Sequence, residues 1–191
     1  MRRATKHDRD VVVKILSRAF EDNKSVNYIV RQDKFRRKRI KALMDYSFQV
    51  CHLFGCVYLS DDNNACALIS FPDQKKATFK SIFLDIKLII KATGWRNISK
   101  VLTRERVISK NYPNAAIYYL WFIGVLPEYQ NQGLGKEMLR EIIEQARMLK
   151  RPIYLETSSE KNVPWYQNAG FEIYKQLDFG YPLYLLKTTN K

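Results

Sequence analysis

The feature that most constrains the fold is a run of three elements in the second half of the chain. Residues 115–126, AAIYYLWFIGVL, are rich in aromatic and β-branched side chains, which is typical of a buried strand. Residues 134–150 then carry apolar side chains at helical spacing, and Pro152 opens a second strand-like run, PIYLET. Two strands joined by a helix pair in parallel, with a right-handed crossover. Residues 115–157 therefore predict a parallel strand pair.

The segments around this unit predict antiparallel strands and helices. The runs CVYLS and ACALISF flank the turn sequence DDNN, so residues 56–71 predict a hairpin. FEIYKQLDF and YPLYLLK predict two final strands, and MRRAT predicts a short first one. Apolar spacing predicts helices at 7–20, 34–54, 79–94 and 97–109, the third with six apolar residues on one face. The fold class is α/β (α+β), a mixed, mostly antiparallel sheet of about six or seven strands with flanking helices.

Composition limits the classes of protein to which the chain can belong. Its 191 residues, 46% of them hydrophobic, suit a single domain over 1–191. Three cysteines without framework spacing argue against a disulfide-stapled secreted protein, and MRRATKHDRD lacks the apolar core of a signal peptide. No apolar run reaches the ~20 residues of a membrane span. We expect a cytoplasmic protein without a membrane partner. The net charge of +14 favours anionic ligands, acidic surfaces or nucleic acid.

Two glycines, Gly133 and Gly135, lie where the first strand of the parallel pair leads into the helix. A helix that starts there presents unpaired N–H groups and the positive end of its dipole, so phosphate is the natural ligand. Glycine permits positive φ and close approach of a ligand, and Lys136 would add a positive charge.

Two well-known phosphate-binding loops do not fit this turn. A Walker loop requires glycine at the position of Gln130 and Ser or Thr at the position of Glu137. The dinucleotide fingerprint requires a third glycine where the chain has Met138. From the glycines alone, a tight turn without a ligand stays an equal alternative.

The surrounding residues carry a family resemblance. VLPEYQNQGLGKEML resembles the acyl-CoA signature of the GNAT N-acetyltransferase superfamily, with Gln130, Gly133 and Gly135 at the three defining positions. LETSSEKNVPWYQNAGF is similar to the second half of that family's pattern, and its form looks most like the puromycin N-acetyltransferase-like branch. The matching positions there are Asn162, Tyr166, Gly170 and Phe171. The resemblance covers residues 115–171, so the first half of the chain rests on topology alone.

The resemblance implies that acetyl-CoA is the co-substrate, bound by the half of the domain from about 115 to 191. The two parallel strands would splay apart, and the pantetheine arm would pair with one of them. The turn amides would hold the pyrophosphate. The implied acyl-CoA-binding residues are Ile123, Gly124, Val125, Gln130, Asn131, Gln132, Gly133, Leu134, Gly135, Lys136, Asn162 and Tyr166.

Two side chains are candidates for the chemistry, in which a neutral amine attacks the thioester. Tyr166 is the candidate general acid for the departing thiolate, a role that its position in the motif favours over the alternative of a packed aromatic residue. Glu156 is the first candidate for the general base, with a solvent-exposed charge or a pair with Lys161 as the alternative. The N–H of Val125 would stabilise the oxyanion. Residues 117–123 lack an acidic residue, so a water chain stays open as the base.

Three further features of the sequence bear on its ligands. The segment KFRRKRIK, residues 34–41, places six basic residues in eight, which indicates either nucleic-acid contact or, as we favour, a solvated helix face. Cys51, His52 and Cys56 do not form a metal-site pattern, and we expect no metal. The helices at 34–54 and 79–109 are expected to build the acceptor pocket, with an aromatic lining. Its expected members are Trp95, Tyr112, Tyr118 and Tyr119.

The leading hypothesis is an acetyl-CoA-dependent N-acetyltransferase that acts on a primary amine of a small molecule or peptide. A non-catalytic acyl-CoA-binding regulator on the same fold is one alternative. An enzyme docked on the ribosome or RNA that acetylates proteins is another. The identity of the amine, the acyl-chain preference and homodimer formation stay open.

Overall fold

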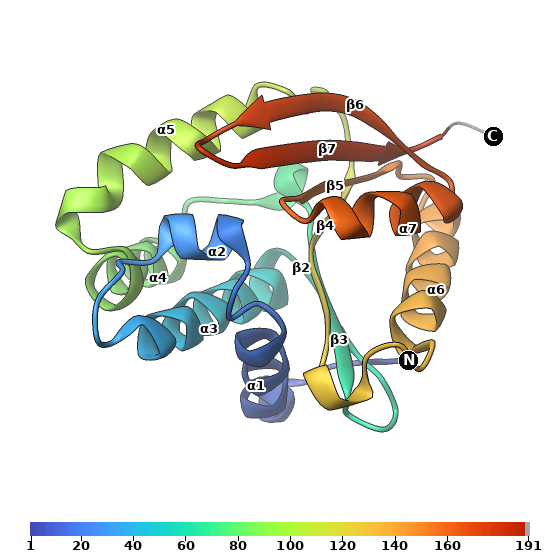
Figure 1. Cartoon of the computed structure of the whole chain (residues 1–191), viewed down its shortest axis with the longest axis horizontal. Helices are drawn as coiled ribbons and strands as arrows, with labels where there is room; N and C mark the ends of the chain where they lie inside the picture. The colour runs from blue at the N-terminus through green and yellow to red at the C-terminus, as the bar shows by residue number, and fades with distance from the viewer. Residues whose placement is uncertain (190–191) are drawn as a thin grey trace.

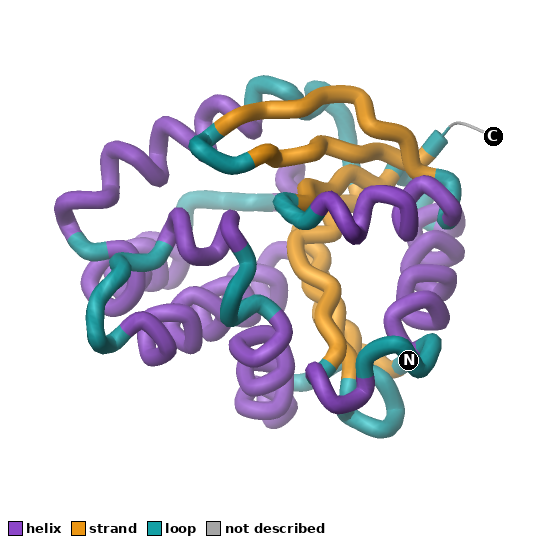
Figure 2. Tube along the Cα trace, in the orientation of Figure 1, coloured by secondary structure: helices purple, strands orange, loops and turns teal. Residues whose placement is uncertain are grey.

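The computed structural model describes residues 1–189, which form a seven-stranded sheet in the order β1-β2-β3-β4-β5-β7-β6 (Figures 1 and 2). The strands are β1 (Arg2–Arg3), β2 (Gly55–Leu59), β3 (Ala65–Ser70), β4 (Tyr118–Val125), β5 (Ile153–Thr157), β6 (Phe171–Asp178) and β7 (Pro182–Thr188). Every neighbouring pair is antiparallel except β4 and β5, which are parallel. The predicted fold class is confirmed.

Helices cover both faces of this sheet, with α1 and α3 on one side and α6 on the other (Figure 1). The helices are α1 (Arg9–Ala19), α2 (Lys24–Ile29), α3 (Arg36–Phe54), α4 (Phe79–Leu88), α5 (Ile98–Ser109), α6 (Leu134–Met148) and α7 (Val163–Asn168). The sequence did not predict α2, a short helix capped by the side chain of Asn23, which accepts a hydrogen bond from Val26 N–H. No helix within residues 1–189 is long and apolar enough to cross a membrane.

Strand β4 contributes to a hydrophobic core on each face of the sheet. Phe122 packs with α1 and α3, whereas Tyr118 and Leu120 pack with α6. Successive strand side chains point to opposite faces, and an irregularity in β4 separates these two sets. Both cores contain fully buried side chains, such as Leu16 in the first and Ile142 in the second.

The parallel pairing of β4 and β5 is short. Only Tyr118 with Ile153 and Tyr119 with Tyr154 are in register, after which the strands separate. On its other edge, β4 contains a bulge at Trp121, because Leu68 and Ile69 of β3 oppose Phe122 and Leu120. A bulge bends the strand that carries it. The carboxyl half of β4 therefore turns away from β5 and leaves a gap.

Residues 71–117 form a helical insertion between β3 and β4, which are nonetheless neighbours in the sheet. The insertion contains α4, a π-turn (η3, Ile89–Thr93), a 3₁₀ turn (η4, Trp95–Asn97) and α5. It lies on the same side of the sheet as α1 and α3 (Figure 1). An amphipathic helix ordinarily buries its apolar face. In α4 most of that face is exposed instead.

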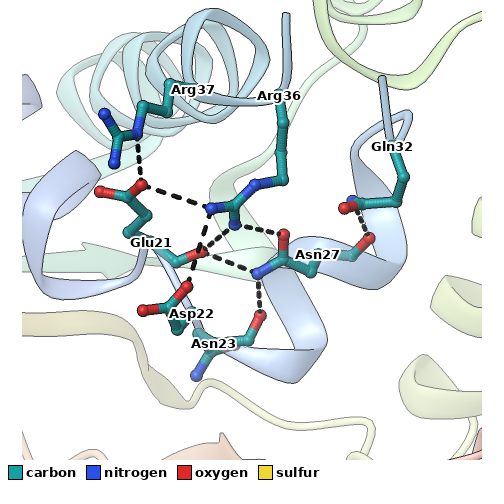
Figure 3. A network of polar contacts seen from close by, with 7 residues as sticks. All are labelled: Glu21, Asp22, Asn23, Asn27, Gln32, Arg36 and Arg37. Atoms are coloured by element: carbon teal, nitrogen blue, oxygen red, sulfur yellow. Dashed lines mark hydrogen bonds and ion pairs between the residues drawn. The ribbon is translucent and has the colours of Figure 1, made fainter. Parts of the chain in front are cut away.

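Half of the basic residues in 34–41 are held within the chain. Arg36 donates to the backbone oxygen of Glu21 at 2.7 Å and to Oδ1 of Asn27 at 3.0 Å, and Arg37 donates to the Glu21 carboxylate (Figure 3). Arg39 binds Asp33 through two hydrogen bonds. These contacts fasten the segment that leads into α2 onto the first turns of α3.

We predict that Gly55→Ala destabilises the fold by about 1–3 kcal/mol, measured as the free energy of unfolding in urea. The new Cβ would lie 2.0 Å from the carbonyl oxygen of Ile69, so β2 and β3 would have to separate. Gly135→Ala is the control, because its Cβ would make ordinary contacts at 3.6–3.7 Å. Equal stability of the two variants would contradict this account of the α3–β2 junction.

Candidate active site

A cavity of about 100 Å³ lies where β4 and β5 separate. It is lined from the sheet by Ile123 and Glu156 and from the loop and helix after β5 by Asn162 and Tyr166. The segment around α2 and residues Arg104 and Glu105 of α5 complete the lining. Both predicted catalytic residues therefore border the same cavity.

Glu156 is partly buried on β5, and its carboxylate accepts hydrogen bonds from two tyrosines. Tyr112 donates to Oε1, and Tyr119 lies 3.2 Å from Oε1 and 3.3 Å from Oε2. Burial raises the pKa of Glu156 above the ordinary carboxyl value, and nearby Arg104 and the tyrosine hydroxyls limit that rise. Within residues 1–189, Glu156 forms no ion pair with Lys161. The environment is that of a desolvated carboxylate whose pKa lies above the ordinary carboxyl value.

The sequence reasoning missed Arg104, a buried cation beside this carboxylate. Arg104 donates to Tyr181 OH on the β6–β7 turn at 3.0 Å and to Ser25 Oγ of α2 at 2.5 Å. It also pairs with Glu105 at 2.5 Å. Helical spacing is the signal that could have identified it, because Arg104 lies four residues before the buried Ile108 and therefore on the same side of α5. Its contacts tie α5, α2 and the final hairpin together around the cavity.

Tyr166 lies on α7 with only 5% of its surface exposed. Its ring packs against Trp165 and Phe171 at centroid distances of 4.7 and 5.7 Å. Burial raises the pKa of Tyr166 above the ordinary phenol value. The hydroxyl is therefore protonated at neutral pH and available only as a proton donor or hydrogen-bonding group.

The glycine turn has the backbone shape that the sequence suggests. Asn131 and Gly133 adopt positive φ of 62° and 87°, and Gly133 is the residue that precedes the first turn of α6. A Cβ at Gly133 would meet no atom within 4 Å, so the conformation and not crowding favours glycine there. Gly135 faces Val125 and Trp165 at ordinary contact distance.

The amides at the start of α6 have no acceptor within the helix. The first helical N–H that donates to a carbonyl is that of Glu137, to Gly133 O at 3.0 Å. The preceding amides belong to the exposed or half-exposed residues 131–136. Two side-chain amides stabilise the turn. Gln130 Nε2 donates to Val125 O at 3.1 Å, and Gln132 Nε2 donates to Glu128 O at 3.2 Å. The turn is thus a preformed set of N–H donors.

The edge of β4 next to the gap also presents backbone groups. Leu126 N–H donates to the carbonyl oxygen of Asn64, the residue just before β3, at 2.9 Å. Backbone groups of successive strand residues point in opposite directions, so those of Val125 and Ile123 point toward the gap. Gly124 has a packing role, because a Cβ at this position would lie only 3.1–3.2 Å from side-chain atoms of Leu16, Ala19 and Phe20 in the α1 region. The absence of a side chain at Gly124 lets α1 approach the sheet.

A second, larger cavity of about 720 Å³ lies between α6 and α7, beside the glycine turn. Gly133, Lys136 and Trp165 line the end near the turn, and Arg140 and Arg147 line the rest along α6. Glu137 and Glu144 alternate with these cations. The cavity continues the donor-rich turn with side-chain positive charge.

None of the four aromatic residues expected to line the acceptor pocket lines the cavity of about 100 Å³. Tyr112 and Tyr119 contact Glu156, as described above. Tyr118 is fully buried in the core beneath α6, on the opposite face of the sheet. Trp95 is 71% exposed on η4 and does not line the cavity. Tyr118 was misplaced because neighbouring strand residues point to opposite faces.

Comparison with known proteins relates the part of the chain that contains the candidate site to one family. Residues 99–173 match the family described as the acetyltransferase (GNAT) domain. The match starts in α5 and ends in β6, so it includes the parallel pair, the glycine turn and the residues that line the gap.

Two curated proteins are similar in sequence. S-alkylcysteine N-acetyltransferase from Bacillus subtilis is 32% identical over 68 residues, which cover 32% of this chain and 38% of that protein. A probable serine/threonine-protein kinase from Dictyostelium discoideum is 22% identical over 193 residues, which cover 90% of this chain and 20% of the kinase. The chain thus spans about two-fifths of the length of the Bacillus protein and about a fifth of the length of the Dictyostelium protein.

Solved structures share the GNAT fold over nearly the whole chain. A structure described as histone acetyltransferase HPA2 and related acetyltransferase, from Corynebacterium glutamicum, has a TM-score of 0.71 at 17% identity and covers 98% of this chain and 93% of its own. The C-terminal condensation domain of Ebony, in complex with beta-alanyl-dopamine, has a TM-score of 0.71 at 12% identity, with 98% and 96% covered. The NatC complex bound to Gag peptide and CoA has a TM-score of 0.53 at 13% identity, with 98% and 93% covered.

We predict that Tyr119→Phe raises the pKa of Glu156 further, because it removes a hydroxyl that stabilises the charged carboxylate. The measurement is a carboxyl titration followed by infrared or carbon NMR spectroscopy. Tyr118→Phe is the matched control, since the adjacent side chain lies on the other face of β4. An equal change in both variants would contradict the described contact.

Proposed function

We propose that this chain is an N-acetyltransferase that transfers an acetyl group from acetyl-CoA to a primary amine of a small molecule or peptide. The observation that carries the proposal is the shared cavity of Glu156 and Tyr166 at the separation of β4 and β5. The GNAT domain match and the fold support acyl transfer as the reaction class. Within the family, membership of the puromycin N-acetyltransferase-like branch is proposed from the motif over 155–171 alone.

The residues that surround the gap fit a coenzyme A thioester. In the proposal, the turn from Gln130 to Lys136 holds the pyrophosphate through the free amides of residues 131–136, since the amide of Gln130 donates to Pro127 O. Ile123 and Val125 pair with the pantetheine arm as an added strand would. Asn162 contacts the arm from the start of α7. Lys136 and Arg140 suit the remaining phosphate charge. The CoA bound in the NatC structure supports this choice of ligand.

Three groups of this chain are assigned to the chemistry. Acetyl-CoA supplies a thioester whose C–S bond breaks as the C–N bond to the amine forms. Glu156 accepts the proton that the ammonium substrate must lose, for which a raised carboxyl pKa is suited. Val125 N–H donates to the oxygen that gains negative charge. Tyr166 gives its proton to the departing thiolate.

The names of similar proteins indicate the range of acceptors to test. The curated relative from Bacillus subtilis is named for an S-alkylcysteine, and the NatC structure contains a peptide. The screen should therefore include amino acids, peptides, polyamines and arylalkylamines, with thiol release and product mass as readouts. CoA binding without acetylation of any amine would favour the non-catalytic regulator. A lack of CoA binding would contradict both functions.

We predict that Glu156→Gln lowers kcat/KM by about 10²–10⁴-fold and leaves CoA affinity unchanged. Wild-type activity should fall as the pH drops through the pKa of Glu156, because the base is inactive when protonated. That pKa is raised, so the fall should begin at a higher pH than for an ordinary carboxylate. The pH–rate profile of the variant should lack this limb. An unaltered profile would assign the base elsewhere.

We predict that Tyr166→Phe lowers kcat by about 10²-fold, with CoA binding retained, because only the proton donor is lost. Tyr184→Phe is the control, since that hydroxyl contacts Glu160 on the surface. Turnover of Tyr166→Phe equal to wild type across the pH range would leave Tyr166 as a packing residue only.

A further inference from the structure

The outward side of α4 carries a row of exposed apolar side chains that neither the cavity nor the proposed chemistry uses. Its members, here called the outer face of α4, are Phe79 (96% exposed), Ile82 (50%), Phe83 (65%), Ile86 (47%) and Ile90 (56%). The first four lie on one side of α4, and Ile90 lies in the π-turn η3 that directly follows it. Contiguous exposure of this kind marks a surface that contacts something apolar.

The orientation of this helix is fixed by contacts on its other side. Leu84 is buried against the core, with 3% of its surface exposed. Tyr46 of α3 donates to Asp85 at 2.7 Å, and Lys87 donates to Asp45 of α3 at 3.3 Å. Turning the phenylalanines inward would break both polar contacts and expose Leu84. The apolar row is therefore a built surface of the folded chain.

The surroundings of the outer face are strongly basic. Residues 72–110 contain ten Lys and Arg and three Asp and Glu, a net charge of +7, which is half of the chain's +14. Lys75, Lys76, Lys80 and Lys91 are all exposed beside or within the apolar row. A second copy of the chain would bring equal positive charge to the same place. The charge instead complements an anionic partner.

We propose that the outer face of α4 docks on an anionic phospholipid bilayer, with the helix lying in the plane of the headgroups. Apolar side chains beside lysines are what such a surface requires, because the first enter the acyl boundary and the second bind lipid phosphates. Nucleic acid would use the lysines but would gain nothing from five large apolar side chains. The proposal departs from the expectation of no membrane partner, which rested on the lack of a spanning segment, because a helix that lies on the surface needs no spanning length.

Trp95 extends this surface along the chain. It is 71% exposed on η4, which contacts η3 directly after α4. Tryptophan is enriched at membrane interfaces. Two turns further, α5 places Arg104 and Glu105 at the cavity. Docking would therefore hold the helical insertion that closes the candidate active site, although the proposal stands on observations independent of acetyl transfer.

The test is sedimentation of the 191-residue chain with vesicles of phosphatidylcholine alone or with 30% phosphatidylserine, at about 0.15 M salt. We expect at least tenfold stronger partitioning to the anionic vesicles. Phe79→Ser with Phe83→Ser should lower that partitioning at least tenfold. Lys76→Gln with Lys80→Gln should lower it by about fivefold for each charge. Trp95 emission should shift to the blue and be quenched by brominated lipids, measured as the difference from Trp95→Phe.

Met148→Ser with Leu149→Ser is the matched control, because both side chains are exposed (67% and 53%) at the far end of α6. This variant should bind vesicles as wild type does, and all variants should keep the wild-type thermal midpoint. Equal binding of the Phe79→Ser/Phe83→Ser variant would overturn the proposal. Equal binding to both vesicle types, or none, would do the same. If light scattering shows that the wild-type chain is a dimer and the Phe79→Ser/Phe83→Ser variant is a monomer, the outer face of α4 would be assigned to contact with a second copy, which would also overturn the proposal.

Discussion

The separation of β4 from β5 after two paired residues is the constraint on which the rest of the site depends. A parallel pair normally continues its hydrogen bonds along both strands, and unpaired backbone groups away from water are costly. The bulge at Trp121 bends β4, and the missing side chain of Gly124 lets α1 support the bent strand closely. The fold thus keeps a set of main-chain donors and acceptors free at the centre of the molecule.

A second constraint on the site is the burial of the Glu156 carboxylate beside these free backbone groups. Its carboxylate lies in the gap and relies on Tyr112 and Tyr119 for hydrogen bonds. Both Tyr112 and Arg104 come from the end of the helical insertion or just beyond α5. The insertion therefore does more than cover the sheet, because it determines how readily Glu156 gains and loses a proton.

Local patterns predicted the parts of the fold that depend on neighbours in sequence. The alternation of strands, the hairpin at 56–71 and the strand–turn–helix unit around Gly133 all have the predicted form. The family motif also placed Glu156 and Tyr166 on elements that border one cavity. These features follow from periodicity, turn chemistry and a short signature.

Features that depend on distant packing were not readable in this way. The contacts of Arg104 with Ser25 and Tyr181 join three segments whose arrangement no local pattern specifies. The apolar row of α4 is visible in the sequence, but its exposure depends on the polar contacts of Asp85 and Lys87 with α3. The placement of Tyr118 and Tyr119 on opposite faces depends on the register of β4.

The most direct measurement of the central claim is an amide NMR titration of the chain with CoA. The account predicts that the N–H signals of residues 131–136, together with those of Ile123 and Val125, shift most and saturate together. Dephosphorylated pantetheine, which lacks the diphosphate, should move the Ile123 and Val125 signals but leave those of the turn in place. Unmoved turn amides at saturating CoA, or shifts centred elsewhere on the sheet, would contradict the account.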